Sequence, residues 1–203
     1  MNKFLFYLLA FTWGLPMTLI GLIVALVLVI AGFKPKKYGY CIHFEVGEHW
    51  GGLELGVVFL TDKTSGIRTK NHELGHGIQN AILGPLFPFL VAIPSSIRYW
   101  LREYKTRKGK IGFSVLVHSI FLVIVAGLSV LAAFTMPWVA VFPVFVGAYS
   151  TLIFSWLLFK EIPQYDQGYV DYDAIWFEGD ATRRGYKFFE DLGEEEQCQD
   201  ISK

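Results

Sequence analysis

The residues with the clearest potential for chemistry are two histidines four positions apart, in the segment TKNHELGHGIQN at residues 69–80. Residues i and i+4 lie on one face of an α-helix, so His72 and His76 can direct both imidazoles at one metal ion. Glu73 is offset from His72 by about 100° around the helix, because a turn takes 3.6 residues. The spacing predicts a zinc site on a helix, with Glu73 beside the metal as general base for a zinc-activated water.

Two histidines leave such a site one ligand short, because a catalytic zinc ion usually has three protein ligands and one water. We choose Glu178 as the third ligand, since the segment DAIWFEGDATRRGYKF around it is a plausible helix. Ala181 lies one turn later on the same face, and Gly75 lies between the histidines, so two small residues would allow the helices to pack closely. The acidic candidates C-terminal to the histidines are Asp166, Asp171, Asp173, Glu178 and Asp180.

The composition indicates an integral membrane protein. Of 203 residues, 53% are hydrophobic and 18% are charged, whereas an ordinary soluble domain is about a quarter charged. Basic and acidic residues both number 18, so nothing in the net charge favours a nucleic-acid partner. Cys41 and Cys198 form no C-x-x-C pair, and we expect free thiols in a reducing compartment.

Apolar blocks predict three membrane spans. Residues 4–33 are more than long enough for one tilted, kinked helix; a helix preceded by a short interfacial piece is the alternative. Residues 111–134 and 139–159 are each long enough to cross, with a tight turn between them, and predict a helical hairpin. Residues 81–97 are apolar but hold three prolines, so we expect an interfacial or re-entrant element there.

Charge predicts the orientation of these spans. Basic clusters at residues 34–37 and 98–110 favour the cytoplasm. If residues 81–97 do not cross, both clusters lie on that side and the N-terminus lies outside. His72, His76 and the C-terminal tail then share the cytoplasmic face, as a ligand from the tail requires.

The predicted fold is an α-helical integral membrane protein with about three spans and a small α+β, zincin-like cytoplasmic module. A β-hairpin pairs residues 40–46 with 53–60, where aromatic and β-branched residues flank several glycines. This hairpin either holds an extended peptide by backbone pairing or simply packs over the metal-binding helix. The expected segments are 1–33, the first span; 34–110, with the hairpin, the HExxH helix and the interfacial segment; 111–160, the helical hairpin; and 161–203, the tail with the third-ligand helix.

HELGH followed by Glu178-x-x-Ala181 resembles the gluzincin metallopeptidases, including the membrane group related to the CAAX prenyl proteases and the heat-shock membrane protease. The wider HELGHGIQNAILGPL is similar to small bacterial membrane proteins of the H-E-x-x-H class. The resemblance implies a bacterial inner-membrane peptidase, with one Zn²⁺ on His72, His76 and Glu178 and Glu73 as general base. Its substrate would be a peptide or a membrane protein.

The chain departs from this family at Thr182, where an aspartate usually supports a liganding histidine. That departure favours a first alternative, a membrane scaffold that binds metal without turnover. A second alternative is an intramembrane protease similar to the site-2 proteases, with Asp166 of the sequence Asp-Gln-Gly as a ligand. Candidate stabilisers of a developing oxyanion are Tyr169, Tyr172, Tyr186, Arg183 and Arg184. His118, inside a predicted span, is expected to be a neutral, hydrogen-bonded histidine within a helix bundle.

Overall fold

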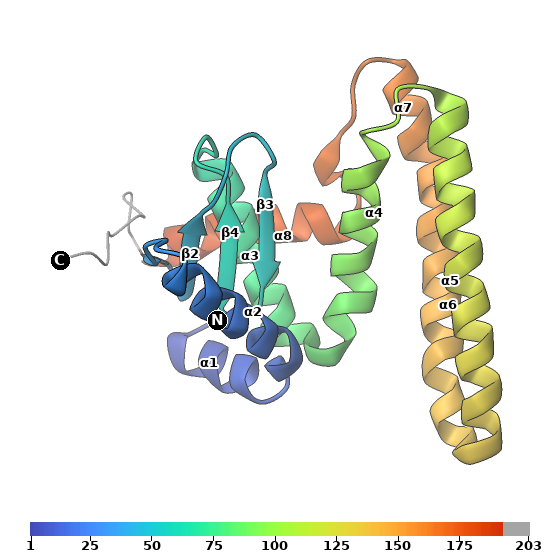
Figure 1. Ribbon diagram of the computed structural model, residues 1–203, viewed down its shortest axis with the longest axis horizontal. Helices are drawn as coiled ribbons and strands as arrows, with labels where there is room; N and C mark the ends of the chain where they lie inside the picture. Colours follow the sequence, from blue (N-terminus) through green and yellow to red (C-terminus); the bar gives the residue numbers. More distant parts are fainter. Residues whose placement is uncertain (193–203) are drawn as a thin grey trace. The chain divides into compact units, whose positions relative to one another are not determined.

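The computed structural model describes residues 1–192 and divides the chain into two compact units. One unit contains Met1–Phe87 together with the C-terminal part from Tyr172 onward, and the other contains Pro88–Asp171. The elements of each unit are labelled in Figure 1. Cys198, one of the two cysteines expected to be free, lies outside the described residues, and Cys41 is a buried free thiol.

A four-stranded sheet forms the first unit's core, with strand order β1-β2-β4-β3. The strands β1 and β2 pair antiparallel, β2 and β4 pair parallel, and β3 and β4 pair antiparallel. Strand β3 lies at one edge of the sheet, next to the helix that contains His72 and His76. The strand bounds are β1 Lys36–Tyr38, β2 Cys41–Glu45, β3 Gly52–Leu55 and β4 Val58–Thr61.

The predicted hairpin between residues 40–46 and 53–60 is wrong. Gly56 has a φ of 76°, and this left-handed conformation turns the chain back within the second predicted strand. Residues 52–61 are therefore themselves a hairpin, in which Leu55 pairs with Val58. The first predicted strand lies beside the far arm of that hairpin and runs parallel to it.

Helix α3, Ile67–Leu83, is the central element of this unit. It contacts β3 and β4 of the sheet and also the C-terminal helix α8, Trp176–Leu192 (Figure 1). Every residue from Asn71 to Ala81 is buried, which a helix covered on one face alone would not show. The HExxH residues therefore lie in the interior of the unit.

The first apolar block is two helices rather than one kinked helix. Helix α1, Lys3–Phe11, and helix α2, Leu15–Ile30, meet at 92°. They are long and apolar enough to cross a membrane only if the bent pair is counted as one span. Pro16 lies in the first turn of α2, where its missing N–H costs no helical hydrogen bond. Gly21 of α2 packs against the Leu55 carbonyl of the β3–β4 hairpin, so this helix is partly built into the first unit.

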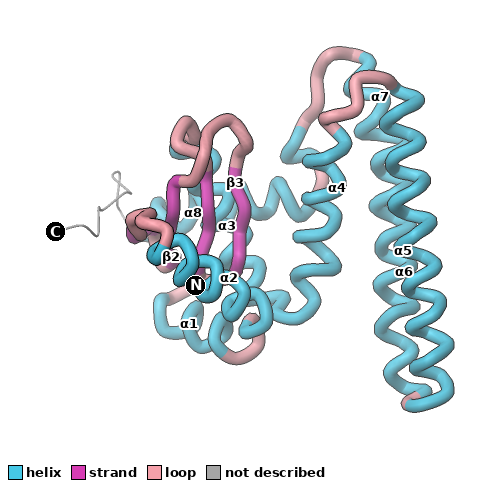
Figure 2. The backbone as a smooth tube through the Cα atoms, viewed as in Figure 1, coloured by secondary structure: helices cyan, strands magenta, loops and turns pink. Residues whose placement is uncertain are grey.

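The second unit is a set of helices in which α5 and α6 run side by side as a hairpin (Figure 2). Arg107–Thr135 and Trp138–Asp166 are each long and apolar enough to cross a membrane. Two bent helix pairs raise the number of candidate spans to as many as four, a range that includes the predicted three. The bounds are η2 Pro88–Ala92, α4 Ile93–Leu101, α5 Arg107–Thr135, η3 Pro137–Ala140, α6 Val141–Trp156, η4 Leu157–Glu161 and α7 Ile162–Asp166.

The proline-rich segment 81–97 is helical throughout, although it is broken into pieces. After α3 come η1, Gly84–Leu86, then η2 and α4. Pro85 and Pro94 each lie in the first turn of such a piece, and Pro88 begins η2. The prolines start new helical segments here because an N-terminal turn tolerates their missing N–H.

Candidate metal centre

Two imidazole nitrogens and one carboxylate oxygen converge between α3 and α8. His72 Nε2 lies 3.0 Å from His76 Nε2 and 3.1 Å from Glu178 Oε2, and His76 Nε2 lies 3.2 Å from the same carboxylate oxygen. Within the described residues, these three side chains form the group that could hold a metal ion. The structure thus brings Glu178 to the two histidines, although about 100 residues of chain separate them.

Small residues allow α3 and α8 to approach this closely. A methyl group at Gly75 would overlap the Ala181 carbonyl, and one at Gly185 would overlap the Asn71 carbonyl. The helix backbones are therefore in direct contact on both sides of the cluster. Gly75 and Ala181 have the packing role that their small size predicted, whereas Gly185 was not foreseen from the sequence.

Glu73 points to the sheet side of α3, next to the edge strand β3. A methyl group at Gly52 would overlap the Glu73 carboxyl group, so the absence of a side chain at Gly52 makes room for it. Burial raises the pKa of Glu73, and the two histidines offset this only in part.

The cluster has the electrostatics of a cation site. Burial raises the pKa of Glu178, but hydrogen bonds from His72 and His76 outweigh it, and the net pKa lies well below the usual range. Burial lowers the pKa of His76, but Glu178 and Glu73 outweigh it and raise it to about 9. The buried carboxylates therefore favour positive charge at this position, as a proton or as a metal ion.

Each histidine is held at its second ring nitrogen. His72 Nδ1 lies 2.8 Å from Thr182 Oγ1, which donates to Asp173 at 3.0 Å.

His76 Nδ1 lies 2.8 Å from Gln79 Oε1. The Gln79 amide donates to the Phe177 carbonyl at 2.8 Å and to Asp180 at 2.9 Å. Gln79 was not predicted from the sequence, although its position three residues after His76 on the same helix could have indicated it.

The other candidate site residues take different positions. Asp166 lies in the second unit, where it forms an ion pair with Arg107. Arg183 and Arg184 both pair with Asp180. Among the tyrosines proposed to stabilise an oxyanion, Tyr172 stands out, because its ring centroid lies 5.6 Å from that of His72.

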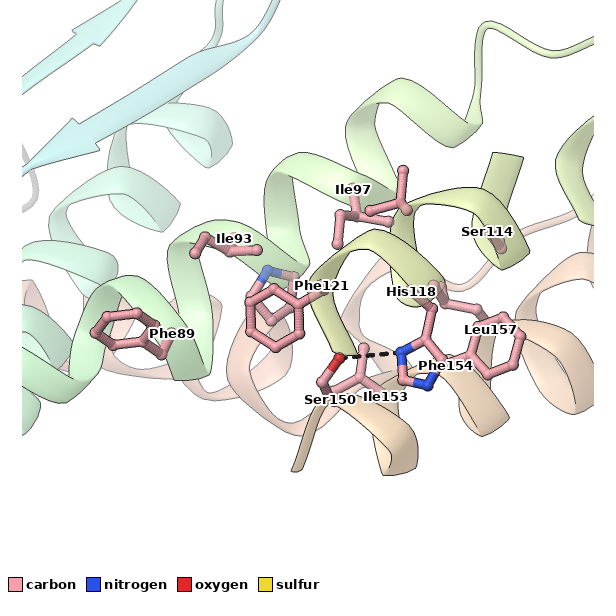
Figure 3. A pocket seen from close by; sticks show the side chains of 12 residues that line it. Phe89, Ile93, Ile97, Ser114, His118, Phe121, Ser150, Ile153, Phe154 and Leu157 are labelled. Atoms are coloured by element: carbon pink, nitrogen blue, oxygen red, sulfur yellow. Dashed lines mark hydrogen bonds between the residues drawn. The ribbon is translucent and has the colours of Figure 1, made fainter. Parts of the chain in front are cut away.

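His118 in the second unit agrees with its sequence interpretation as a hydrogen-bonded histidine in a helix bundle. Its Nδ1 lies 3.1 Å from Ser150 Oγ, across the α5–α6 hairpin (Figure 3). Its ring stacks on Phe154 with centroids 4.4 Å apart. The surrounding pocket is mostly apolar and includes Phe89, Ile93, Phe121 and Leu157.

Comparisons of the chain with protein-family models, curated proteins and solved structures give no match.

Proposed function

We propose that the protein is a zinc-dependent membrane metallopeptidase in which His72, His76 and Glu178 hold the metal. The observation that carries the proposal is the convergence of two imidazole nitrogens and one carboxylate oxygen within 3.2 Å of one another. Two histidines and a glutamate are a ligand set of catalytic zinc sites.

The spacing of the three atoms fits a zinc ion after a small expansion. Zinc ligands at about 2.0–2.1 Å in a tetrahedron lie about 3.3–3.4 Å apart. The observed separations of 3.0, 3.1 and 3.2 Å are a few tenths of an ångström shorter. The three atoms therefore lie close to the spacing that a shared zinc ion requires.

Glu73 is the proposed general base. When bound, zinc lowers the pKa of a coordinated water to about 7 and polarises a carbonyl oxygen. Glu73 accepts a proton from the attacking water and delivers it to the leaving amine. Burial raises the pKa of this carboxyl group, which brings it closer to the range that both transfers need.

The edge position of strand β3 supports the proposal that the substrate is a peptide. This strand is the last on its side of the sheet, and Gly52 in it adjoins Glu73. An extended peptide can add to a free strand edge through backbone hydrogen bonds. A substrate bound there would bring its backbone next to the general base, so we propose an extended peptide or a membrane-protein segment as substrate.

The helices long and apolar enough to cross a bilayer support a membrane location. Many of the large apolar side chains of α5 are exposed, among them Leu116, Val123 and Leu131, as expected for a helix that faces lipid. We propose that the metal site and the C-terminus lie on the cytoplasmic side, as the basic clusters at residues 34–37 and 98–110 favour.

The test measures metal content and hydrolysis separately. Purified wild-type protein is expected to contain one zinc per chain, and His72→Ala is expected to lose it. Glu73→Gln should retain the zinc and lose hydrolysis of a quenched-fluorescent peptide library. Absence of stoichiometric zinc in the wild type, or undiminished hydrolysis by Glu73→Gln, would contradict the peptidase proposal. Zinc binding without hydrolysis of any peptide or membrane protein would instead favour the metal-binding scaffold.

A further inference from the structure

We propose that Asp173 and Asp180 are positioning residues for the metal site, acting through Thr182 and Gln79 on the two histidines. The inference rests on the proposed metal site and does not require that the site hydrolyses peptides. Two hydrogen-bond chains carry it. One runs from His72 through Thr182 to Asp173, and the other runs from His76 through Gln79 to Asp180.

The second chain fixes the orientation of the His76 ring. The Phe177 carbonyl can only accept a hydrogen bond, so the Gln79 group facing it at 2.8 Å must be the amide nitrogen. Gln79 Oε1 then faces His76 Nδ1 at 2.8 Å and can only accept. His76 Nδ1 must therefore carry the hydrogen, and the lone pair of its neutral form is on Nε2, which points at His72 and Glu178.

The hydrogen bonds of the first chain run in the same direction, from the histidine toward the aspartate. The Thr182 hydroxyl has one hydrogen, and it donates this hydrogen to Asp173 Oδ1. At His72 Nδ1 the hydroxyl oxygen must then accept, so this nitrogen also carries a hydrogen. Both imidazoles therefore direct Nε2 toward Glu178. In each case the tautomer is set by a neutral side chain that donates to an aspartate, and Gln79 also donates to the Phe177 carbonyl.

His72 is therefore linked to a carboxylate even though position 182 is a threonine. That carboxylate belongs to Asp173, which Thr182 connects to His72 through two hydrogen bonds, and which also pairs with Arg68 at 2.9 Å. The matching carboxylate of the other chain, Asp180, pairs with Arg183 and Arg184. Each chain therefore ends in a charged acceptor that also forms an ion pair at the protein surface.

The decisive variant for the first chain is Thr182→Val, which keeps the shape of the side chain and removes the hydroxyl. Loss of a group that orients a ligand typically costs about 10- to 100-fold in metal affinity. We expect a loss of that size in the zinc Kd, measured by competition with a chromophoric chelator on the full chain in detergent. Thr182→Ser retains the hydroxyl and should bind zinc within about threefold of wild type.

Asp173 is tested in combination with Thr182. Asp173→Asn should weaken zinc binding by about tenfold in the wild-type background, and should have little further effect in Thr182→Val, because the connection to His72 is already lost. Arg68→Gln is the matched control. Its side chain is 70% exposed and contacts Asp173 without contacting Thr182, so zinc affinity should change less than about twofold.

The second chain is tested with Gln79→Met and Asp180→Asn, in the same assay. Both should weaken zinc binding, and Asp180→Asn should add little to Gln79→Met. Cobalt substitution supplies a second readout, because the visible absorption of Co²⁺ reports ligand geometry. The bands should shift in Thr182→Val and Gln79→Met and remain unchanged in Arg68→Gln.

The outcomes separate the two proposals. Wild-type zinc affinity and wild-type cobalt spectra in Thr182→Val and Gln79→Met would overturn the positioning role and leave the metal site intact. Additive losses in the Asp173→Asn, Thr182→Val pair would also overturn it, since Asp173 would then act independently. Failure of the wild type to bind zinc would overturn both the positioning role and the metal site. Weakened zinc binding in the variants without any hydrolysis by wild type would uphold the positioning role and contradict only the peptidase.

Discussion

Gly75, between the two histidines, lies directly against the backbone carbonyl of Ala181, one turn after Glu178. This contact brings the two helices close enough for one carboxylate oxygen to reach both imidazoles. The convergence of His72, His76 and Glu178 therefore requires glycine at position 75, because any other residue would place a carbon atom against the Ala181 carbonyl. The same relationship recurs at Gly185 and Asn71, so the approach of α8 to α3 is determined at two points.

Gly75→Ala is expected to displace α8 and disrupt the site. Overpacking of this kind costs about 1–3 kcal/mol of stability, and the three ligand atoms would no longer converge. We expect zinc affinity to fall at least about tenfold, as measured by chelator competition. Gly127→Ala in α5 is the control, because a methyl group there meets nothing within 4 Å; it should keep wild-type zinc affinity. Equal zinc affinity in the two variants would contradict the packing argument.

Gly52→Ala should separate metal binding from catalysis. A methyl group at this position overlaps the Glu73 carboxyl group, which supplies the three atoms nearest to it. We expect the zinc content to remain stoichiometric while kcat for peptide hydrolysis falls by about 10- to 100-fold, because the general base is displaced. The measurement is steady-state hydrolysis together with metal analysis of the same preparation. Unchanged kcat would show that Glu73 tolerates the shift or has no part in the reaction.

Stability of the second unit should depend on the buried ion pair between Arg98 and Glu161. Their Nε and Oε2 atoms lie 2.6 Å apart, and both residues are almost completely buried. Removing one partner of a buried pair typically costs about 3–5 kcal/mol, so Glu161→Gln should markedly lower the thermal unfolding temperature in detergent. The double variant Arg98→Met, Glu161→Leu should be less destabilised than Glu161→Gln. A Glu161→Gln protein as stable as wild type would contradict this expectation.

His43 should make the first unit sensitive to mild acid. Burial and the charge of Lys70 lower the pKa of His43 from 6.5 to about 4. As the pH falls below 6.5, the unfolded chain takes up a proton that the folded chain does not, so stability is present above that pH and is lost toward pH 4. The linkage amounts to about 2 kcal/mol between pH 7 and pH 5.

The check is thermal unfolding at pH 7 and pH 5, in the presence of a chelator that removes any metal contribution. His43→Gln keeps a hydrogen-bonding partner for Thr61, which lies 2.8 Å from His43 Nε2, and should show a smaller loss of stability between the two pH values. His49→Asn is the control, because His49 is exposed and has a φ of 59° that asparagine tolerates. Equal pH dependence in wild type and His43→Gln would contradict the assignment.

Features that depend on a single helix could be predicted from the local sequence. The four-residue spacing of His72 and His76 implies a shared face because every α-helix has the same period. The small size of Gly75 and Ala181 implies a close approach for a similarly local reason, and the apolar lengths of α5 and α6 identify candidate spans. These inferences needed no knowledge of the remainder of the chain.

Tertiary structure decided which distant groups meet. The sequence alone indicated one hairpin of two long strands, but the turn at Gly56 depends on how the β3–β4 hairpin packs against Gly21 of α2. In the sequence, Thr182 in place of an aspartate suggested a weakened site. The hydrogen bond from Thr182 to Asp173 could not be foreseen, because it depends on the path of the chain into α8. The sequence determined the residue types and their helical periodicity. Only the folded chain determined their partners, because hydrogen bonds and packing contacts depend on distances in space that separation along the chain does not specify.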